Sequence, residues 1–194
     1  MNVPSSNFRV LTADLIEKVR GWRNQPRIKR NMISDAKITS EQQKKWFEGL
    51  ADDPARKYMT FFQDETPVGL LYFSSITRES CEWGCYIGEE AVWPGSGLLL
   101  EVAALDYAFN FLEVECLIAE VFEFNIAPQR MHDFFGYKNL GLSDQVIERD
   151  GVEYRLIRYC YEKNAWLARR EQVMNSLPRQ IRVAVEKISF NSEN

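Results

Sequence analysis

The sequence predicts one mixed α/β domain, with a mostly antiparallel sheet flanked by helices and a helical extension at its C-terminal end. Three observations support this fold class. Short apolar segments with strand-like alternation are interspersed with segments of helical periodicity, two turn motifs predict hairpins, and a glycine-containing break precedes a long apolar helix. We expect residues 1–163 to form the domain and residues 164–194 the extension.

The N-terminal segment is expected to hold a short strand followed by two helices. Asp14 with Glu17, and Thr39 with Gln42, have the spacing of a capping box, in which two side chains satisfy free N–H groups at a helix start. The expected elements are a strand at 8–11 and helices at 14–24 and 40–50.

Three strands are expected next. The turn residues Asp64-Glu65-Thr66-Pro67 predict a hairpin between the first two of them. Pro94-Gly95-Ser96-Gly97 then interrupts the chain before a long apolar helix. The expected elements are strands at 58–63, 68–76 and 81–88 and a helix at 98–112.

The remainder of the domain is expected to add a strand, a short helix and a second hairpin. Asp150-Gly151 is a strong signal for that hairpin. Beyond the domain, apolar residues at helical spacing predict helices, with a break at Pro178, that pack on the domain or on a second subunit in a homodimer. The expected elements are strands at 116–122, 145–148 and 152–161 and a helix at 127–135.

Composition excludes several classes of protein. The formal net charge of −4 argues against a nucleic-acid surface, and no apolar run reaches the roughly 20 residues that cross a membrane. The N-terminal residues lack the charged and apolar regions of an export signal. Four cysteines without a C-x-x-C pair, and a single histidine, argue against a metal site. We therefore expect a cytoplasmic protein with reduced cysteines and no metal.

The pair Gly95-x-Gly97 lies between a strand and a helix. Glycines allow a ligand to approach the backbone closely, and the helix start presents free N–H groups and the positive end of its dipole. Such a site suits a pyrophosphate, although a tight turn alone would also explain the pattern. The loop has neither the third glycine of a dinucleotide fingerprint nor the Gly-Lys-Ser/Thr of a P-loop.

A second motif runs from Asn125 to Tyr137, where a strand end, a polar residue, a short helix and a glycine follow one another. Asn125 could cap the helix or bind amide groups of a ligand. His132 is the only histidine of the chain. It could be a packed residue, or an acid if a site lies nearby, because its pKa falls near neutral pH.

Together the two motifs resemble those of the GNAT superfamily of acetyltransferases. The pyrophosphate loop of that family reads Gln/Arg-x-x-Gly-x-Gly/Ala, and Gly95 and Gly97 match it, whereas Val92 stands in place of Gln or Arg. The next family motif reads Asn-x-x-Ala-x-x-Leu-Tyr-x-Lys-x-Gly-Phe. His132 stands at its tyrosine, the usual general acid, and the matching residues are Asn125, Gly136 and Tyr137.

The N-terminal half narrows the resemblance. It is similar to the acetyltransferases of pseudaminic acid biosynthesis, which act on the 4-amino group of a UDP-linked 4-amino-4,6-dideoxy sugar destined for a flagellin glycan. The segments that carry this similarity are Trp22-Arg23-Asn24-Gln25-Pro26, Asn31-Met32, Trp46-Phe47-Glu48, Pro67-Val68-Gly69 and Glu82-Trp83-Gly84-Cys85-Tyr86-Ile87-Gly88.

The resemblance implies direct acetyl transfer from acetyl-CoA. The strands at 81–88 and 116–122 would diverge, and the pantetheine arm would lie between them. A backbone N–H near Tyr86 or Ile87 would polarise the thioester carbonyl. The cofactor-binding residues implied are Tyr86, Ile87, Gly95, Ser96, Gly97, Leu98 and Asn125.

The same resemblance assigns the proton transfers and the acceptor site. His132 would protonate the leaving thiolate, and Glu120 would accept the proton of the amine, through water. An apolar pocket would hold the methyl group of the 6-deoxy sugar, and polar side chains would meet the nucleotide. The substrate-binding residues implied are Arg23, Asn24, Met32, Trp46, Phe47 and Tyr86.

Two alternatives stay open. The ribosomal-protein acetyltransferases share a similar N-terminal region, so the acceptor could be a protein N-terminal amine. The departures at Val92 and His132 would also fit a GNAT module that binds acetyl-CoA without turning it over.

Overall fold

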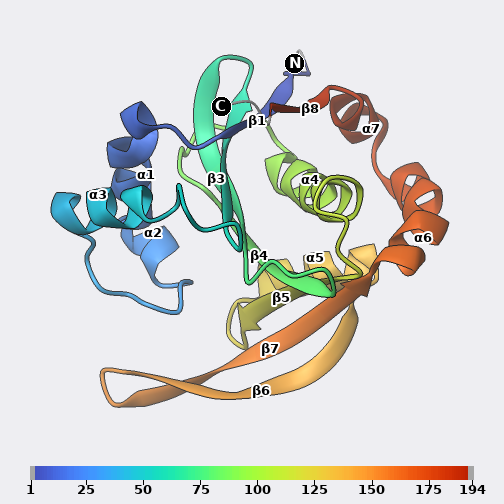
Figure 1. Ribbon diagram of the computed structural model, residues 1–194. Coiled ribbons are helices and arrows are strands. Elements are labelled where there is room, and N and C mark those ends of the chain that lie inside the picture. Colours follow the sequence, from blue (N-terminus) through green and yellow to red (C-terminus); the bar gives the residue numbers. More distant parts are fainter. Residues whose placement is uncertain (1–2, 192–194) are drawn as a thin grey trace.

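The computed structural model describes residues 3–191, and its centre is one eight-stranded sheet (Figure 1). The strand order is β6-β7-β5-β4-β3-β2-β1-β8. Neighbouring strands are antiparallel except in the β4–β5 and β1–β8 pairs. This arrangement confirms the mixed, mostly antiparallel sheet that the sequence predicts.

The elements follow one another in a simple order along the chain. The strands are β1 (Ser6–Val10), β2 (Lys57–Gln63), β3 (Thr66–Ser74), β4 (Ser80–Ile87), β5 (Cys116–Phe122), β6 (Lys138–Arg149), β7 (Val152–Glu162) and β8 (Ile188–Asn191). The helices are η1 (Ala13–Leu15), α1 (Ile16–Arg23), α2 (Pro26–Lys29), α3 (Ser40–Glu48), α4 (Ser96–Asn110), α5 (Ile126–Phe135), α6 (Lys163–Ser176) and α7 (Arg179–Val185).

The helices cover the two faces of the sheet with different cores. Helices α1, α2 and α3 lie on one face, and α4 lies on the other, with α6 and α7 outside it (Figure 1). Helix α4 is apolar on nearly all sides and buried along most of its length, as expected for a helix between two layers. The larger core surrounds α4, and a smaller one lies beneath α1 and α3.

Of the two capping boxes, one is confirmed and one is wrong. Thr39 Oγ1 accepts a hydrogen bond from the N–H of Gln42, whose side chain accepts one from the N–H of Thr39, so α3 begins as expected. Asp14 instead lies inside the 3₁₀ turn η1, and α1 begins after Leu15 without a side-chain cap. The turn shifts the helix start by two residues, which removes Asp14 from the capping position.

The structure adds strand residues that sequence patterning does not indicate. β6 spans 12 residues instead of the four expected, because its exposed, polar residues resemble a loop until β7 pairs with them. β8 is a strand within the extension, for which only helices were expected, and it pairs in parallel with β1. Both strands form because they pair with segments that local sequence patterns do not take into account.

The C-terminal extension packs into the same core as the domain. The side chains of Trp166, Val173 and Ile181 are buried in the core around α4. Trp166 Nε1 and Arg170 also donate hydrogen bonds to the carboxylate of Asp106 in α4. The extension therefore docks on the domain of its own chain, and α4 is enclosed between it and the sheet.

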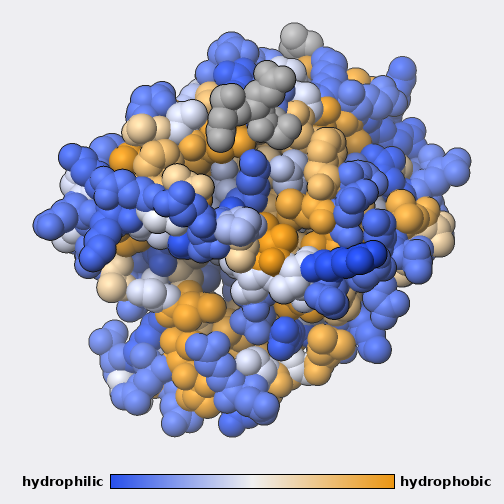
Figure 2. All heavy atoms as spheres, viewed as in Figure 1, coloured by the Kyte–Doolittle hydropathy of each residue, from blue (hydrophilic) through white to orange (hydrophobic). Residues whose placement is uncertain are grey.

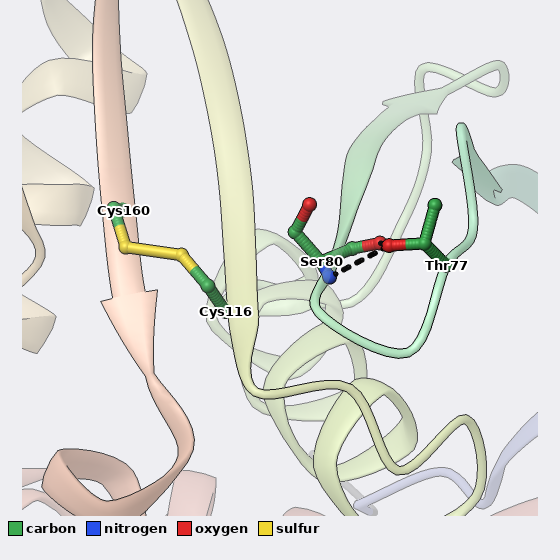
Figure 3. The surroundings of a disulfide bond; sticks show 4 residues. All are labelled: Thr77, Ser80, Cys116 and Cys160. Atoms are coloured by element: carbon green, nitrogen blue, oxygen red, sulfur yellow. Dashed lines mark hydrogen bonds between the residues drawn. A yellow bond between two sulfur atoms is a disulfide. The ribbon is translucent and has the colours of Figure 1, made fainter.

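The cysteines differ from expectation. Cys116 of β5 and Cys160 of β7 form a disulfide, next to the turn in which the N–H of Ser80 donates to Thr77 (Figure 3). The expectation of four reduced cysteines is therefore wrong for these two. The register makes them diagonal neighbours on one face, because Cys160 pairs with Ile118, two residues beyond Cys116.

Within residues 3–191, no helix has the length and apolar character needed to span a membrane. The same part of the chain contains no group of three or more His, Cys, Asp or Glu side chains arranged to hold a metal ion.

Candidate active site

A gap opens in the sheet where β4 and β5 diverge. Their parallel pairing covers only residues 80–82 and 116–118. Beyond that point β4 continues along β3 as far as Ile87, and β5 continues along β7 as far as Phe122. Beyond that point the facing edges of β4 and β5 do not pair with each other. The carbonyl of Ile87 accepts from Arg27 and that of Phe122 from Gln129, and a ligand with amide groups could bind to the backbone between these ends.

The alternation of backbone groups shows which residues of β4 face this gap. The carbonyl of Glu79 accepts a hydrogen bond from the N–H of Cys116, so it points toward β5. Residues at even spacing from it, including Cys85 and Ile87, share that direction. The backbone of Tyr86 faces β3 instead, so an N–H that polarises a carbonyl in the gap would come from Cys85 or Ile87.

The two glycines of the loop before α4 have different surroundings. Gly95 has φ +106°, and a Cβ there would clash with Ile181 of α7. At Gly97 the nearest side-chain atom to an added Cβ would be Met131 Cε, at 3.7 Å. Gly95 is thus required by the backbone conformation and by packing, whereas Gly97 leaves space beside the helix start, as a pyrophosphate site needs.

The loop is braced from within. The hydroxyl of Ser96 donates to the carbonyl of Trp93 (2.5 Å) and accepts from Gln63 Nε2 (2.6 Å). The N–H groups of Ser96 and Leu98 donate to carbonyls of the same turn. Ser96 and Leu98 therefore shape the loop, and Gln63, which the sequence does not single out, holds it against β2.

Asn125 lies just before α5, at the end of β5. It occupies the N-cap position but forms no side-chain capping bond. Gln129 instead occupies the carbonyls at the end of β5, with bonds of 3.1 Å to Phe122 and 3.0 Å to Glu123. The capping role for Asn125 is therefore not used, and its amide is available to a ligand.

His132 lies on the α4 face of the sheet, beside the point where the strands diverge. Its side chain is buried, with 3% of the residue exposed, and its Nδ1 lies 3.1 Å from Glu101 Oε1 of α4. The ring contacts Trp83 of β4 and two tyrosines, with centroid distances of 5.9 Å to Trp83, 4.5 Å to Tyr137 and 5.0 Å to Tyr159. The structure thus places His132 against the α4 face of the sheet, in contact with side chains of β4 and β7.

Two polar atoms of this cluster are buried without a hydrogen-bond partner in the described part of the chain: the Tyr137 hydroxyl and Trp83 Nε1. Buried polar groups are rarely left unpaired, because each costs about 1–3 kcal/mol. The Tyr137 hydroxyl is nevertheless near enough to Glu101 and Trp83 for both to act on its pKa. Space for a ligand such as acetyl-CoA is therefore indicated by the open approach at Gly97 and by the diverging strands.

Glu120 lies on the opposite face of β5 from His132. Its neighbours Ala119 and Val121 belong to the core around α4, so its side chain points away from that core. Burial, and then the nearby carboxylate of Glu82, raise the pKa of Glu120. Arg158 is its ion-pair partner at 4.0 Å, too far for a strong bond. Sequence patterning did not single out Glu82.

A cavity of about 500 Å³ lies on the Glu120 face, between β2–β4 and α1–α3. Four of the six expected acceptor residues line it, and two do not. Phe47 packs in the small core beneath α1 and α3. The side chain of Asn24 donates to the carbonyl of Ile38 and accepts from its N–H. The lining residues include Arg23, Met32, Lys37, Trp46, Tyr58, Tyr72 and Tyr86.

Arg23 is one of two charged residues in the described cavity lining, with Lys37. One guanidinium nitrogen donates to the carbonyl of Ser34, and Nη1 is buried without a partner among the described residues. Burial lowers the pKa of Arg23. A buried guanidinium with a free donor is suited to an anionic ligand group, such as a phosphate.

The β6–β7 hairpin forms one edge of the sheet and extends toward the loop after α2 (Figure 1). Figure 2 shows a hollow in the surface between the hairpin and the α1–α3 region. Arg149 near its tip donates to the carbonyls of Arg30, Met32 and Ile33, and its guanidinium lies 4.6 Å from the ring centre of Phe122. Sequence analysis missed this link, because it depends on the full length of β6.

Known proteins share this architecture. The model of the acetyltransferase (GNAT) domain matches residues 7–138. The chain is 36% identical over 119 residues to Acetyltransferase PseH of Campylobacter jejuni, covering 61% of this chain and 74% of that protein.

Solved structures share the fold at lower identity. Spermidine N-acetyltransferase from Vibrio cholerae, in complex with CoA and spermine, has a TM-score of 0.79 at 17% identity and covers 84% of this chain and 98% of that one. C. jejuni PseH in complex with acetyl coenzyme A has a TM-score of 0.58 at 24% identity, covering 81% and 99%. The chain therefore belongs to the GNAT family and is an acetyl-CoA-dependent N-acetyltransferase.

Proposed function

We propose that the protein transfers the acetyl group of acetyl-CoA to the 4-amino group of a UDP-linked 4-amino-4,6-dideoxy sugar, as a step of pseudaminic acid biosynthesis. The observation that carries the proposal is the cavity that combines aromatic walls with Arg23 on the Glu120 face of the diverging strands. The similarity to PseH supports the same assignment.

The cavity lining matches the chemistry of such an acceptor. Met32 and Trp46 supply apolar surface for the methyl group of a 6-deoxy sugar, and aromatic rings suit the faces of sugar and base. Arg23 Nη1 is free to bind a phosphate oxygen. Because Tyr86 belongs both to the cavity and to β4, an amine held in the cavity would lie next to the gap.

In this proposal the chain's residues divide the reaction between the two faces of the sheet. Acetyl-CoA supplies the activated acetyl group. The loop at Gly97 holds the pyrophosphate, Asn125 binds the pantetheine amides, and an N–H of β4 polarises the carbonyl. Glu120 accepts the proton of the amine through water, and His132 donates a proton to the sulfur as the C–S bond breaks and the C–N bond forms.

The lining also discriminates against a polyamine acceptor. Among the described residues that line the cavity there is no Asp or Glu, whereas Arg23 and Lys37 are present. A polycation would therefore meet like charge, which costs several kcal/mol when the groups are brought together. A protein N-terminal amine stays as the second candidate, because it brings one amine to the cavity rather than the several positive charges of a polyamine.

An acetyl-transfer assay with matched acceptors tests the proposal. Purified protein and acetyl-CoA are incubated with a UDP-linked 4-amino-4,6-dideoxy sugar, with peptides that have free N-termini, or with spermidine, and CoA release is measured. The account expects turnover with the nucleotide sugar alone. Turnover confined to peptides or spermidine would refute the acceptor, and acetyl-CoA binding without any turnover would favour a non-catalytic module.

A further inference from the structure

Glu101 has no assigned role in the mechanism above, although it is the more buried of two carboxylates in α4. The other one, Asp106, is bonded to Arg170 and Trp166 of the extension. Glu101 is 4% exposed, its Oε1 lies 3.1 Å from His132 Nδ1, and the Tyr137 hydroxyl is also within reach of its carboxylate. A buried carboxylate requires a partner, and here the imidazole is the one that can carry a positive charge.

The surroundings contain no alternative cation in contact with this pair. The rings against His132 come from β4, β7 and the segment after α5, and they belong to Trp83, Tyr159 and Tyr137. Cys85 of β4 is near enough for the charge of Glu101 to raise the pKa of its thiol, after the larger effect of burial. The charged groups on adjoining turns are Asp133 of α5, which acts on Tyr159, and Arg169 of α6, which lies against Gly136.

We propose that Glu101 is a positioning residue that orients His132 for proton donation to the leaving sulfur. The inference rests on the proposed role of His132. The carboxylate accepts the hydrogen bond of Nδ1–H and stabilises the imidazolium, so Nε2–H is the proton that is transferred. When the C–S bond breaks, the sulfur takes the proton from Nε2 and the neutral ring keeps its proton on Nδ1. The ring then regains a proton from solvent, balancing the one released by the amine.

Tyr137 is the rival donor in the same cluster. Burial, and then the charge of Glu101, raise the pKa of its phenol well above its usual value. A phenol of raised pKa is a weaker acid toward a thiolate, so the Tyr137 hydroxyl is the poorer proton donor of the two. The family motif has phenylalanine at this position, so Tyr137→Phe is a matched control that removes only the hydroxyl.

The single histidine makes the test direct, because one imidazole signal appears in the NMR spectrum of the full chain. The ¹⁵N shifts of the ring and kcat are measured in the unmodified protein and in Glu101→Gln, Glu101→Asp and Tyr137→Phe. We expect Glu101→Gln to move the ring proton away from Nδ1 and to lower kcat about tenfold or more, with the KM for acetyl-CoA within about twofold. Glu101→Asp should restore part of both, and Tyr137→Phe should lower kcat less than Glu101→Gln does.

Each other outcome has a defined meaning. Unchanged ring ¹⁵N shifts, or changed shifts with unchanged kcat, in Glu101→Gln would overturn the positioning role while leaving the acid role of His132 intact. Full activity in His132→Ala would instead refute the acid role itself. If Glu101→Gln does not fold, the ¹⁵N shifts of the unmodified protein decide: a ring with a proton on Nδ1, neutral or doubly protonated, supports the inference, and a neutral ring with its proton on Nε2 contradicts it.

Discussion

The two faces of the sheet are built differently on either side of the gap between β4 and β5. On the α4 face, His132, Glu101, Trp83 and Tyr137 form a compact buried cluster. On the opposite face, α1–α3 and three strands surround an open cavity of about 500 Å³. In the proposed function the first face meets the cofactor and the second meets the acceptor.

The comparison shows where specificity resides. Residues of the α4 face are held by close packing and by a buried pair, so substitutions there should alter the chemical step. Residues of the cavity project from separate elements into open space, so substitutions there should alter acceptor binding. Measurements that separate kcat from the two KM values can therefore support or refute the division.

His132→Ala should have the largest effect of any substitution on turnover. A general acid contributes about 10²–10⁴-fold, so kcat should fall by that amount, with acetyl-CoA affinity nearly unchanged. His132→Tyr should recover part of the rate, because the family uses a phenol here. Steady-state kinetics and calorimetry of acetyl-CoA check both statements. Near-normal kcat in a folded His132→Ala protein would show that the thiolate leaves without this acid.

Gly97→Asp should nearly abolish acetyl-CoA binding without unfolding the protein. The space beside Gly97 accepts a side chain, but a carboxylate there would face the pyrophosphate, and such like-charge contact costs several kcal/mol. The rise in Tm on adding acetyl-CoA should disappear. A retained shift would place the cofactor elsewhere.

Gly95→Ala is the matched contrast within the same loop. Its φ of +106° and the contact with Ile181 predict lower stability even without ligand, by about 1–2 kcal/mol from the backbone alone. Thermal unfolding of the free protein distinguishes the two variants. Equal stability of Gly95→Ala and the unmodified chain would contradict the packing assigned to α7.

Arg23→Ala should raise the KM for the nucleotide sugar by about 10–150-fold, because a charge-assisted hydrogen bond contributes about 1.5–3 kcal/mol. The KM for acetyl-CoA should change little. Arg9→Ala is the control, since Arg9 lies on β1, away from the cavity, and forms its ion pair with the exposed Glu65. An increase in both KM values would mean that Arg23 supports the fold rather than the acceptor.

The smallest expected effect concerns the pH profile. Glu120 must be ionised to accept a proton, so activity should rise as pH increases through its raised pKa. Glu82→Gln removes the one neighbouring charge that raises it, and the acidic limb should move to lower pH by a fraction of a unit. A shift to higher pH, or none, would indicate that Glu120 is not the base.

Sequence reasoning succeeded where the relevant residues lie close together in the chain. The order of the elements, the capping box at Thr39 and the glycine loop follow from local patterns, and the structure bears them out. The motif around His132 has the family spacing, so the sequence pointed to His132 but not to Glu101 or Trp83 beside it. A carboxylate within an apolar helix could also have identified Glu101, because such residues are rarely buried without a partner.

Other parts of the site depend on contacts that no local pattern encodes. Arg149 reaches the loop after α2 only because β6 extends over 12 residues, and Cys116 meets Cys160 only through the β5–β7 register. The same limit applies to Asn24. Its residue type suggested a ligand contact, but the structure uses it to hold the backbone of Ile38.

The central claim is that the cofactor and the acceptor meet in the gap between β4 and β5 from opposite faces of the sheet. A bisubstrate analogue, in which CoA is joined through an acetyl link to the 4-amino group of the UDP sugar, tests it most directly. Calorimetry should give a Kd at least about 100-fold lower than that of either half, because the second half binds at high effective concentration. An analogue that binds no more tightly than CoA alone would contradict the account.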